Sequence, residues 1–483
     1  MPLTRAAAVP TIARLRSSSP GPGPGCVSTT MPPKSPTARH KRGAPASSAA
    51  PRLVSETPFG ESSLQLRRFR LANGLTVLLL RDASAPVLSY QTWLRVGSRH
   101  EQPGKTGLAH LFEHLMFNET ENLGAGLFDR RIEAAGGETN ASTWTDWTHY
   151  HSDLPAAELS TIVKLEADRL QNLVLREPQV RSEKEVVANE RRFRVEDDVE
   201  GTMQELLYAE AFRHHPYGHP TIGWMADIEG FTTRDCERFY RRYYAPNNTT
   251  LVIAGDFDEA RLLRLLQRHY GPMRAARLPK NPAVTEPTQR RERVSRLVLS
   301  TPTEKLLLGY HAPAFGDPDY AALSIANELL FGSRSARLFQ RLVRRDQCAS
   351  EVTGSIAPFA EPGLLDIYAG LRPEHHIEEA LAAIEEELER MKDETVSEDE
   401  LERVKSRAEL GFLMAMETAS GKAEQLGFYE TVLGDAALLF TRLEQYRRVS
   451  TADVRRVCAR FFESRRRTRI EVRPADGASG AAA

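Results

Sequence analysis

The sequence has few cysteines and no long apolar run. Its four cysteines, Cys26, Cys236, Cys348 and Cys458, lie far apart and form no C-x-x-C pair. That spacing argues against a disulfide framework and against a thiolate zinc site. The longest clean apolar run, at 75–80, is far shorter than the ~20 residues that cross a bilayer, so no membrane span is expected.

The chain also lacks a net charge of either sign. Its 64 Lys and Arg residues balance 65 Asp and Glu residues, so no overall field favours nucleic acid or anionic lipid. The 483 residues are 41% apolar and 27% charged, as in an ordinary soluble protein. Because typical domains have roughly 100–200 residues, the length predicts more than one domain.

Acidic residues are absent from the first 55 residues, which contain eight basic residues and many Ser, Pro, Gly and Ala. Such a segment buries too little apolar surface to offset its ordering entropy, so we expect a disordered basic tail at 1–64 and a second tail at 475–483. An organelle transit peptide and a non-functional extension both fit the basic tail. The lack of an apolar secretory core favours a cytoplasmic location.

Between these tails the chain repeats itself. An amphipathic pattern ending in two aromatic residues occurs at 233–244 and again at 451–462, each time before a strand-like run. A strand followed by a helix, at 90–117, returns at 305–330. Matches in the same order predict two homologous halves, 65–275 and 294–474, joined by a linker at 276–293. Alternating strands and long helical patterns predict the α+β class, each half a mainly antiparallel sheet covered by helices.

One helical segment carries the residues typical of a catalytic metal site. His110 and His114 are four residues apart, so both imidazoles lie on one helix face, and Glu113 lies beside them. The H-x-x-E-H pattern inverts the H-E-x-x-H arrangement of zinc peptidases. Two neutral nitrogen ligands and a nearby carboxylate suit Zn²⁺, with Glu113 as the general base for the attacking water. A solvated helix face is the alternative, but the surrounding apolar residues favour a partly buried helix whose polar groups need a partner.

A third zinc ligand is expected on a second helix. Glu183 and Glu190 are seven residues apart, about two helical turns, so they share one face, whereas Glu185 points elsewhere. We assign Glu190 as the third metal ligand. We assign Glu183 to a catalytic supporting role, as a partner that orients a ligand or modulates the water. The site would bind one Zn²⁺ per chain.

These residues resemble the pitrilysin/insulinase-type zinc metallopeptidases, a family that includes mitochondrial processing peptidase. Beyond the histidines and glutamates already named, the resemblance rests on three segments: 97–101, 244–248 and 330–338. It implies the same zinc ligands, His110, His114 and Glu190, with Glu113 as base. It also implies that Asn140 and Ala141, on an expected edge strand, bind substrate through main-chain hydrogen bonds. An ordinary strand is the alternative for that segment.

The second half differs from the first at the metal-binding positions. At an offset of 215 residues, the four site residues fall on Ile325, Glu328, Leu329 and Lys405, which cannot hold the same ion. We expect the second half to close over the first and enclose a chamber that admits unfolded peptide. Active relatives often carry an Arg and a Tyr seven apart in this half, where the present chain has Val343 and Ser350.

The sequence therefore predicts a zinc-dependent endopeptidase that cleaves peptides or unfolded protein segments. The alternatives are a zinc-bearing subunit of a heterodimeric peptidase, which needs an Arg/Tyr partner, and a non-catalytic structural homologue. A homodimer or a heterodimer with a homologous subunit is expected, and no nucleic-acid partner.

Overall fold

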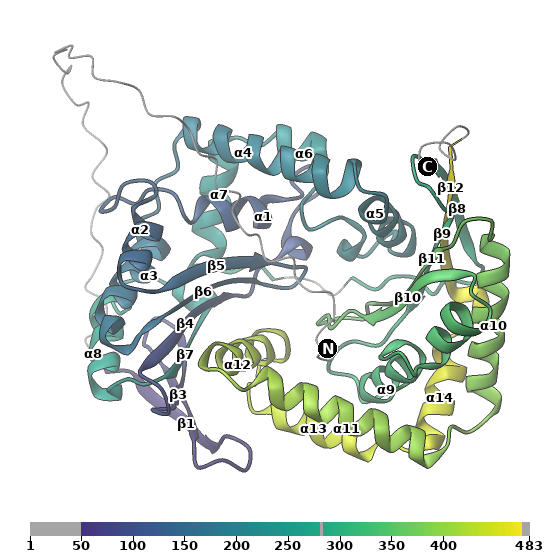
Figure 1. Ribbon diagram of the computed structural model, residues 1–483. Helices are drawn as coiled ribbons and strands as arrows, with labels where there is room; N and C mark the ends of the chain where they lie inside the picture. The colour runs from purple at the N-terminus through teal and green to yellow at the C-terminus, as the bar shows by residue number, and fades with distance from the viewer. Residues whose placement is uncertain (1–49, 281–283, 476–483) are drawn as a thin grey trace.

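The computed structural model describes residues 50–280 and 284–475, which form two sheets with helices packed on them (Figure 1). The first sheet has seven strands, in the spatial order β1 (Arg52–Pro58), β2 (Gln65–Arg70), β3 (Thr76–Arg81), β7 (Thr249–Gly255), β4 (Val87–Leu94), β6 (Thr148–Pro155) and β5 (Glu138–Thr143). The second has five strands, in the order β10 (Ala349–Ile356), β11 (Leu364–Leu371), β9 (Lys305–His311), β12 (Arg467–Pro474) and β8 (Arg293–Leu299). The α+β class and the two helix-covered sheets are confirmed.

The two sheets share one topology. The order β3-β7-β4-β6-β5 in the first sheet matches β8-β12-β9-β11-β10 in the second. Each sheet has one parallel pair, β3 with β7 and β12 with β8, and its other pairs are antiparallel. The sheets are therefore mixed, and the expected mainly antiparallel pairing is confirmed with one parallel pair in each sheet. A parallel neighbour requires a long crossover rather than a hairpin, and here almost the whole half lies between the two strands.

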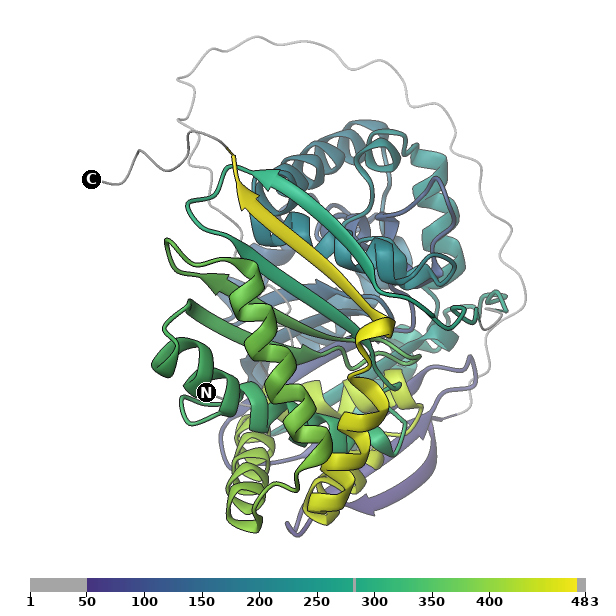
Figure 2. The same cartoon turned by 90° about the vertical axis from the view of Figure 1, so that its right-hand side faces the viewer.

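Helices of both halves pack on the two sheets (Figure 1). The first half contains α1 (Leu108–Leu115), α2 (Leu127–Ala134), α3 (Leu159–Asn172), α4 (Glu177–Arg191), α5 (Val199–Ala211), α6 (Met225–Glu229), α7 (Thr233–Tyr243) and α8 (Glu259–Tyr270). The second half contains α9 (Asp319–Phe331), α10 (Ile377–Asp393), α11 (Glu398–Ala415), α12 (Ala419–Leu433), α13 (Leu438–Arg448) and α14 (Thr451–Phe461). Figure 2 shows α10 and α14 on the outer face of the second sheet.

One part of the predicted N-terminal tail is folded. Strand β1 pairs antiparallel with β2 at the edge of the first sheet, with Arg52 opposite Arg70 and Pro58 opposite Gln65. The expected disorder of 1–64 is therefore wrong for 50–64. Composition misled because β1 is an exposed edge strand, held by backbone hydrogen bonds rather than by burial of its own side chains. Residues 1–49, with the rest of that expectation, lie outside the described residues.

The halves exchange one helix each. Helix α12 of the second half packs on β3, β4 and β7 of the first sheet, whereas α5 of the first half packs on β8, β9 and β12 of the second (Figure 1). Each sheet is thus covered on one face by helices of its own half and on the other face by a helix of the other half of the chain. The enclosed chamber stays a prediction. No helix within 50–280 and 284–475 is long and apolar enough to cross a bilayer.

A glycine permits the close approach of α12 to the first sheet. A Cβ atom at Gly427 would lie 2.1 Å from Nε1 of the buried Trp93 ring. We predict that Gly427→Ala destabilises the protein by about 1–3 kcal/mol, because overpacking against a fixed ring outweighs the gain of about 1 kcal/mol in helix propensity. Urea unfolding measures this change. Gly124→Ala is the control, because its nearest neighbour is 3.5 Å away. A more stable Gly427→Ala protein would contradict the packing argument.

Candidate metal centre

Helix α1 begins at a buried cap that fixes its first turn. The carboxylate of Glu101 accepts hydrogen bonds from the backbone N–H groups of Gly107 at 2.8 Å and Ala109 at 2.6 Å. Gly107, the N-cap residue, has φ of 96°, a left-handed conformation that glycine adopts without strain. The apolar residues of α1 pack into the core of the first half and leave His110, Glu113 and His114 on the side toward α4. His110 and Glu113 are only 6% and 5% exposed.

Helix α4 brings Glu190 to the two imidazoles. Its Oε2 atom lies 3.4 Å from His114 Nε2 and 3.7 Å from His110 Nε2. The three ligand atoms lie within 4.8 Å of one another, and no other such group of His, Cys, Asp and Glu occurs in the described part of the chain. In a tetrahedral site with zinc bonds of about 2.0–2.1 Å, two ligand atoms lie about 3.3 Å apart. The observed spacing therefore fits one zinc ion between α1 and α4.

Unpaired buried atoms support this fit. His114 Nε2 is inaccessible to solvent and has no hydrogen-bond partner among the described residues. Glu190 Oε1 is also buried without a hydrogen bond, although Arg194 Nε lies 3.2 Å away as an ion-pair partner. A buried polar atom without a partner is costly, and native proteins usually satisfy it with protein, water or an ion. Two imidazoles and one carboxylate form a donor set that zinc accepts.

Burial and neighbouring charges shift the pKa values of all three ligand residues. Burial lowers the pKa of His110 to about 4, so this imidazole is neutral at pH 7, as metal binding requires. Burial would also lower the pKa of His114, but the carboxylates of Glu190, Glu113 and Glu183 outweigh it and raise that pKa. Burial opposes ionisation of Glu190, yet the two histidines and Arg194 hold its pKa below the usual value.

Glu113 lies close to His114 and has a raised proton affinity. Burial raises the pKa of its carboxyl to about 7, against the opposing effects of His114 and the Thr143 hydroxyl on β5. A general base is most effective when its pKa lies near the working pH. The side chain thus combines a position beside the imidazoles with a pKa suited to proton transfer.

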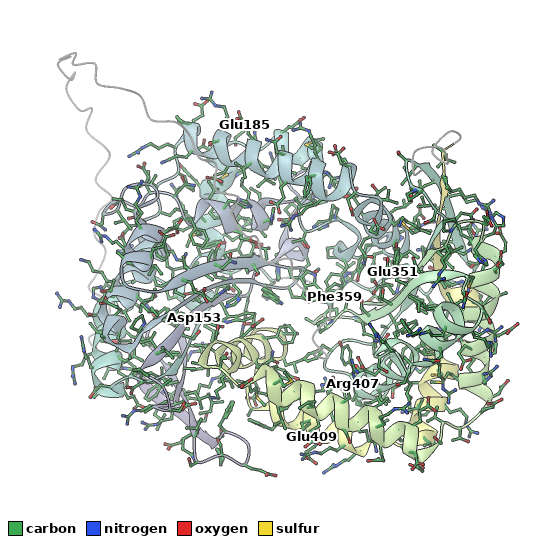
Figure 3. The ribbon with its side chains drawn as sticks, in the orientation of Figure 1. Asp153, Glu185, Glu351, Phe359, Arg407 and Glu409 are labelled. Atoms are coloured by element: carbon green, nitrogen blue, oxygen red, sulfur yellow. The ribbon has the colours of Figure 1, made fainter. Side chains whose placement is uncertain are left out.

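Glu183 lies two turns before Glu190 on α4 and also faces His114. Its Oε2 lies 3.7 Å from His114 Nδ1, and its Oε1 accepts a hydrogen bond from Asn118 Nδ2 at 2.9 Å. Glu183 therefore faces the imidazole nitrogen opposite to the one that faces Glu190. A carboxylate in that position orients the ring of a metal ligand. Glu185, by contrast, is exposed on the outer side of α4 (Figure 3).

Two contributors were not predicted from the sequence. Arg194 follows Glu190 by four residues in a short π-helical turn, 192–196, and Asn118 lies three residues after the end of α1. The i, i+4 spacing of Glu190 and Arg194 was a usable signal for the ion pair. The contact of Asn118 with Glu183 joins two segments 65 residues apart, and no local pattern indicates it.

Asn140 and Ala141 lie on β5, the edge strand of the first sheet. They pair with His151 and Tyr150 of β6, so the other side of β5 has no strand neighbour within the described residues. Strand β5 also contacts α1, and its Thr143 lies beside Glu113. A peptide added to this edge would therefore run past the histidines and Glu113.

The metal-site positions of the second half lack the three ligands. Ile325 and Leu329 are buried in the core of that half. Glu328, the counterpart of Glu113, has Oε2 at 3.5 Å from Arg407 Nε. Val343 packs against the same core, and the Ser350 hydroxyl donates to the Gly370 carbonyl. Lys405 pairs with Glu402, one turn away on α11.

Known proteins are similar to this chain in both fold and sequence. The family profile described as insulinase (peptidase family M16) matches residues 76–224, and that of the peptidase M16 inactive domain matches 230–408. A zinc protease of Helicobacter pylori, PqqE, is 30% identical over 408 residues, 84% of this chain and 92% of that protein. An uncharacterized zinc protease of Mycobacterium bovis is 30% identical over 411 residues, again 84% and 92%.

The chain belongs to the insulinase family of peptidases, M16. A crystal structure of a Helicobacter pylori protease superposes with a TM-score of 0.81 at 29% identity, covering 85% of this chain and 99% of that one. The M16 structure from Pseudomonas fluorescens, described as an inactive domain, has a TM-score of 0.76 at 17% identity, which shows the fold alone. His110, Glu113, His114, Glu183 and Glu190 all fall inside the insulinase match, so a peptidase-type function is supported for this M16 protein.

The raised pKa of Glu113 predicts a pH-dependent stability of the metal-free protein. Because the folded state holds the Glu113 proton more tightly than the unfolded state, its contribution is full below about pH 4.3 and is lost as the pH rises through about 7. Glu113→Gln should therefore raise the free energy of unfolding at pH 8, by on the order of 3 kcal/mol, and change it little at pH 4.5. Denaturant unfolding in the presence of a chelator measures both values. Glu185→Gln is the control, and a Glu113→Gln protein that is less stable at pH 8 would contradict the assignment.

Proposed function

We propose that this M16 protein is a zinc-dependent endopeptidase that hydrolyses peptides or unfolded protein segments. One Zn²⁺ would be held by His110, His114 and Glu190. When bound there, it would supply a Lewis acid that polarises the scissile carbonyl and makes water a stronger acid. The observation that carries the proposal is the convergence of three ligand atoms within 4.8 Å, with the carboxyl of Glu113 beside them.

The side chains divide the remaining work. Glu113 takes the proton of the attacking water and returns it to the leaving amine, a transfer that its pKa of about 7 favours. Glu183 keeps the His114 ring in its ligand orientation from the far nitrogen. Arg194 pairs with Glu190 Oε1, which leaves Oε2 for the metal. The neutral imidazole of His110 donates a lone pair without first losing a proton.

The substrate would bind as an extra strand on the edge of β5. Main-chain groups at Asn140 and Ala141 would hold the peptide, and Thr143 marks the end of β5 nearest Glu113. In this structure the Asn140 side chain accepts the backbone N–H of Ala141 at 2.9 Å, so a substrate carbonyl would compete for that donor. Recognition through the main chain favours extended segments, which folded proteins do not present.

A second candidate function is the zinc-bearing subunit of a heterodimeric peptidase. Val343 and Ser350 stand where active relatives are expected to carry an Arg and a Tyr, and neither can bind an oxyanion as a guanidinium or a phenol does. A homologous partner would then supply that pair. A non-catalytic structural role is disfavoured, because that role gives no reason to keep His110, Glu113, His114 and Glu190 together.

We predict that the purified chain cleaves a quenched, unstructured peptide and that a chelator stops the reaction. Glu113→Gln should lower kcat by about 10²–10⁴-fold, because proton transfer is lost. Its zinc content should stay at one ion per chain, because Glu113 is not a ligand. Glu185→Gln on the outer side of α4 is the matched control and should keep full activity.

The same assay separates the alternatives. Activity that appears only after a homologous subunit is added supports the heterodimer. Zinc binding without cleavage in any combination contradicts the peptidase proposal, and so does a Glu113→Gln protein that is fully active.

A further inference from the structure

The tip of the β10–β11 hairpin crosses from the second half to the first. Phe359 is buried among aromatic rings of the first half, with ring centroids 5.2 Å from Trp144 and 4.5 Å from Tyr217. Its label lies between the two halves in Figure 3. The next residues bond to the same half, because Ala360 N donates to Asp146 Oδ2 at 3.0 Å and Glu361 N donates to Tyr217 Oη at 3.1 Å.

The Glu361 carboxylate holds two cationic or polar groups of the first half. Its Oε1 accepts from Arg99 Nη2 at 2.5 Å, and its Oε2 lies 2.8 Å from His215 Nε2. His215 Nδ1 already accepts the backbone N–H of Tyr217, so Nε2 carries the proton and donates it to Glu361. Arg99 also donates to Asp146 Oδ1 at 2.8 Å. These side chains are at most one quarter exposed, so solvent screens their interaction only in part.

Arg99 belongs to the segment that starts the metal-bearing helix. The backbone N–H of Arg99 donates to Thr145 O, and that of Ser98 donates to Trp144 O, at the turn that follows β5. Two residues after Arg99, Glu101 caps α1 through Gly107 and Ala109. The segment 97–101 thus contacts the second half through one side chain and α1 through another. A bulkier residue at Gly97 would collide with this arrangement, because its Cβ would lie 2.2 Å from Trp144 O.

We infer that the second half positions the candidate metal site, with Glu361 fixing Arg99 and thereby the start of α1. Glu361 is a positioning residue, since its carboxylate contacts Arg99 and His215 and none of the three metal-ligand residues. The half without the metal-ligand residues then contributes to the site through a specific contact. This inference rests on the proposed metal site, but its structural part, the coupling of the hairpin tip to α1, can be measured without zinc.

A matched ion pair between the halves provides the control. Lys422 Nζ on α12 lies 2.6 Å from Asp82 Oδ2, and both side chains are about as buried as Arg99. The backbone N–H of Asp82 donates to Gly255 O, and Gly255 pairs with Leu88 at the start of β4. Leu94, at the other end of β4 and nearest to segment 97–101, is six residues further on, or about 20 Å along the strand. Breaking this pair loosens the contact between the halves without touching the start of α1.

The experiment compares Glu361→Ala and Lys422→Met with the unaltered full-length chain. In the metal-free proteins, hydrogen–deuterium exchange of peptides covering 105–117 should be several-fold faster in Glu361→Ala and unchanged in Lys422→Met. Competition with a chromophoric chelator should show a zinc Kd raised about tenfold in Glu361→Ala only, the lower end of the effect of removing a residue that supports ligands. In Glu361→Ala the kcat should fall as the zinc Kd rises, while KM stays the same.

Glu361→Gln keeps the shape of the side chain and loses its charge, so its exchange rate and zinc Kd should lie between those of Glu361→Ala and the unaltered chain. It replaces Glu361→Ala in the comparison if that variant does not fold. Unchanged exchange at 105–117 in the Glu361 variants overturns the inference, as does an equal increase in Lys422→Met. A chain that binds no zinc refutes the proposed function instead, and the exchange comparison still decides the coupling.

Discussion

The structure depends on one contact between two helices that are far apart in the sequence. Oε2 of Glu190 on α4 faces the Nε2 atoms of both His110 and His114 on α1, at 3.7 and 3.4 Å. These side chains are at most 12% exposed, and several of their polar atoms have no hydrogen-bond partner among the described residues. A core that gathers such groups pays a desolvation cost unless something binds them. The proposed metal ion would account for this arrangement, whereas stability alone accounts for it less well.

Both halves have the same strand order, but only the first carries the three candidate metal ligands. Each half also lends one helix to the other's sheet. In the second half the helix that corresponds to α1 has buried aliphatic residues at the histidine positions, and its glutamate, Glu328, faces the guanidinium of Arg407. In the second half, the Arg407 guanidinium thus lies beside the Glu328 carboxylate.

The sequence was most informative where the pattern is local. Helical spacing placed His110, Glu113 and His114 on one face, and the same reasoning placed Glu183 and Glu190 on another. It could not show that the two faces meet, which is a tertiary fact. The contacts of Arg99 with Glu361 and of Asn118 with Glu183 join distant segments without any periodic signal, so they were not predicted. Strand β1 was missed because an exposed edge strand has no buried face to leave an alternating pattern, and the parallel pairs because strand order is not encoded locally.

The most direct measurement of the central claim is anomalous diffraction from crystals of the chain grown with zinc. The account predicts one strong peak between α1 and α4, about 2.0–2.2 Å from His110 Nε2, His114 Nε2 and Glu190 Oε2. A crystal with ordered side chains and no peak there would contradict it, and so would a peak whose ligands exclude Glu190.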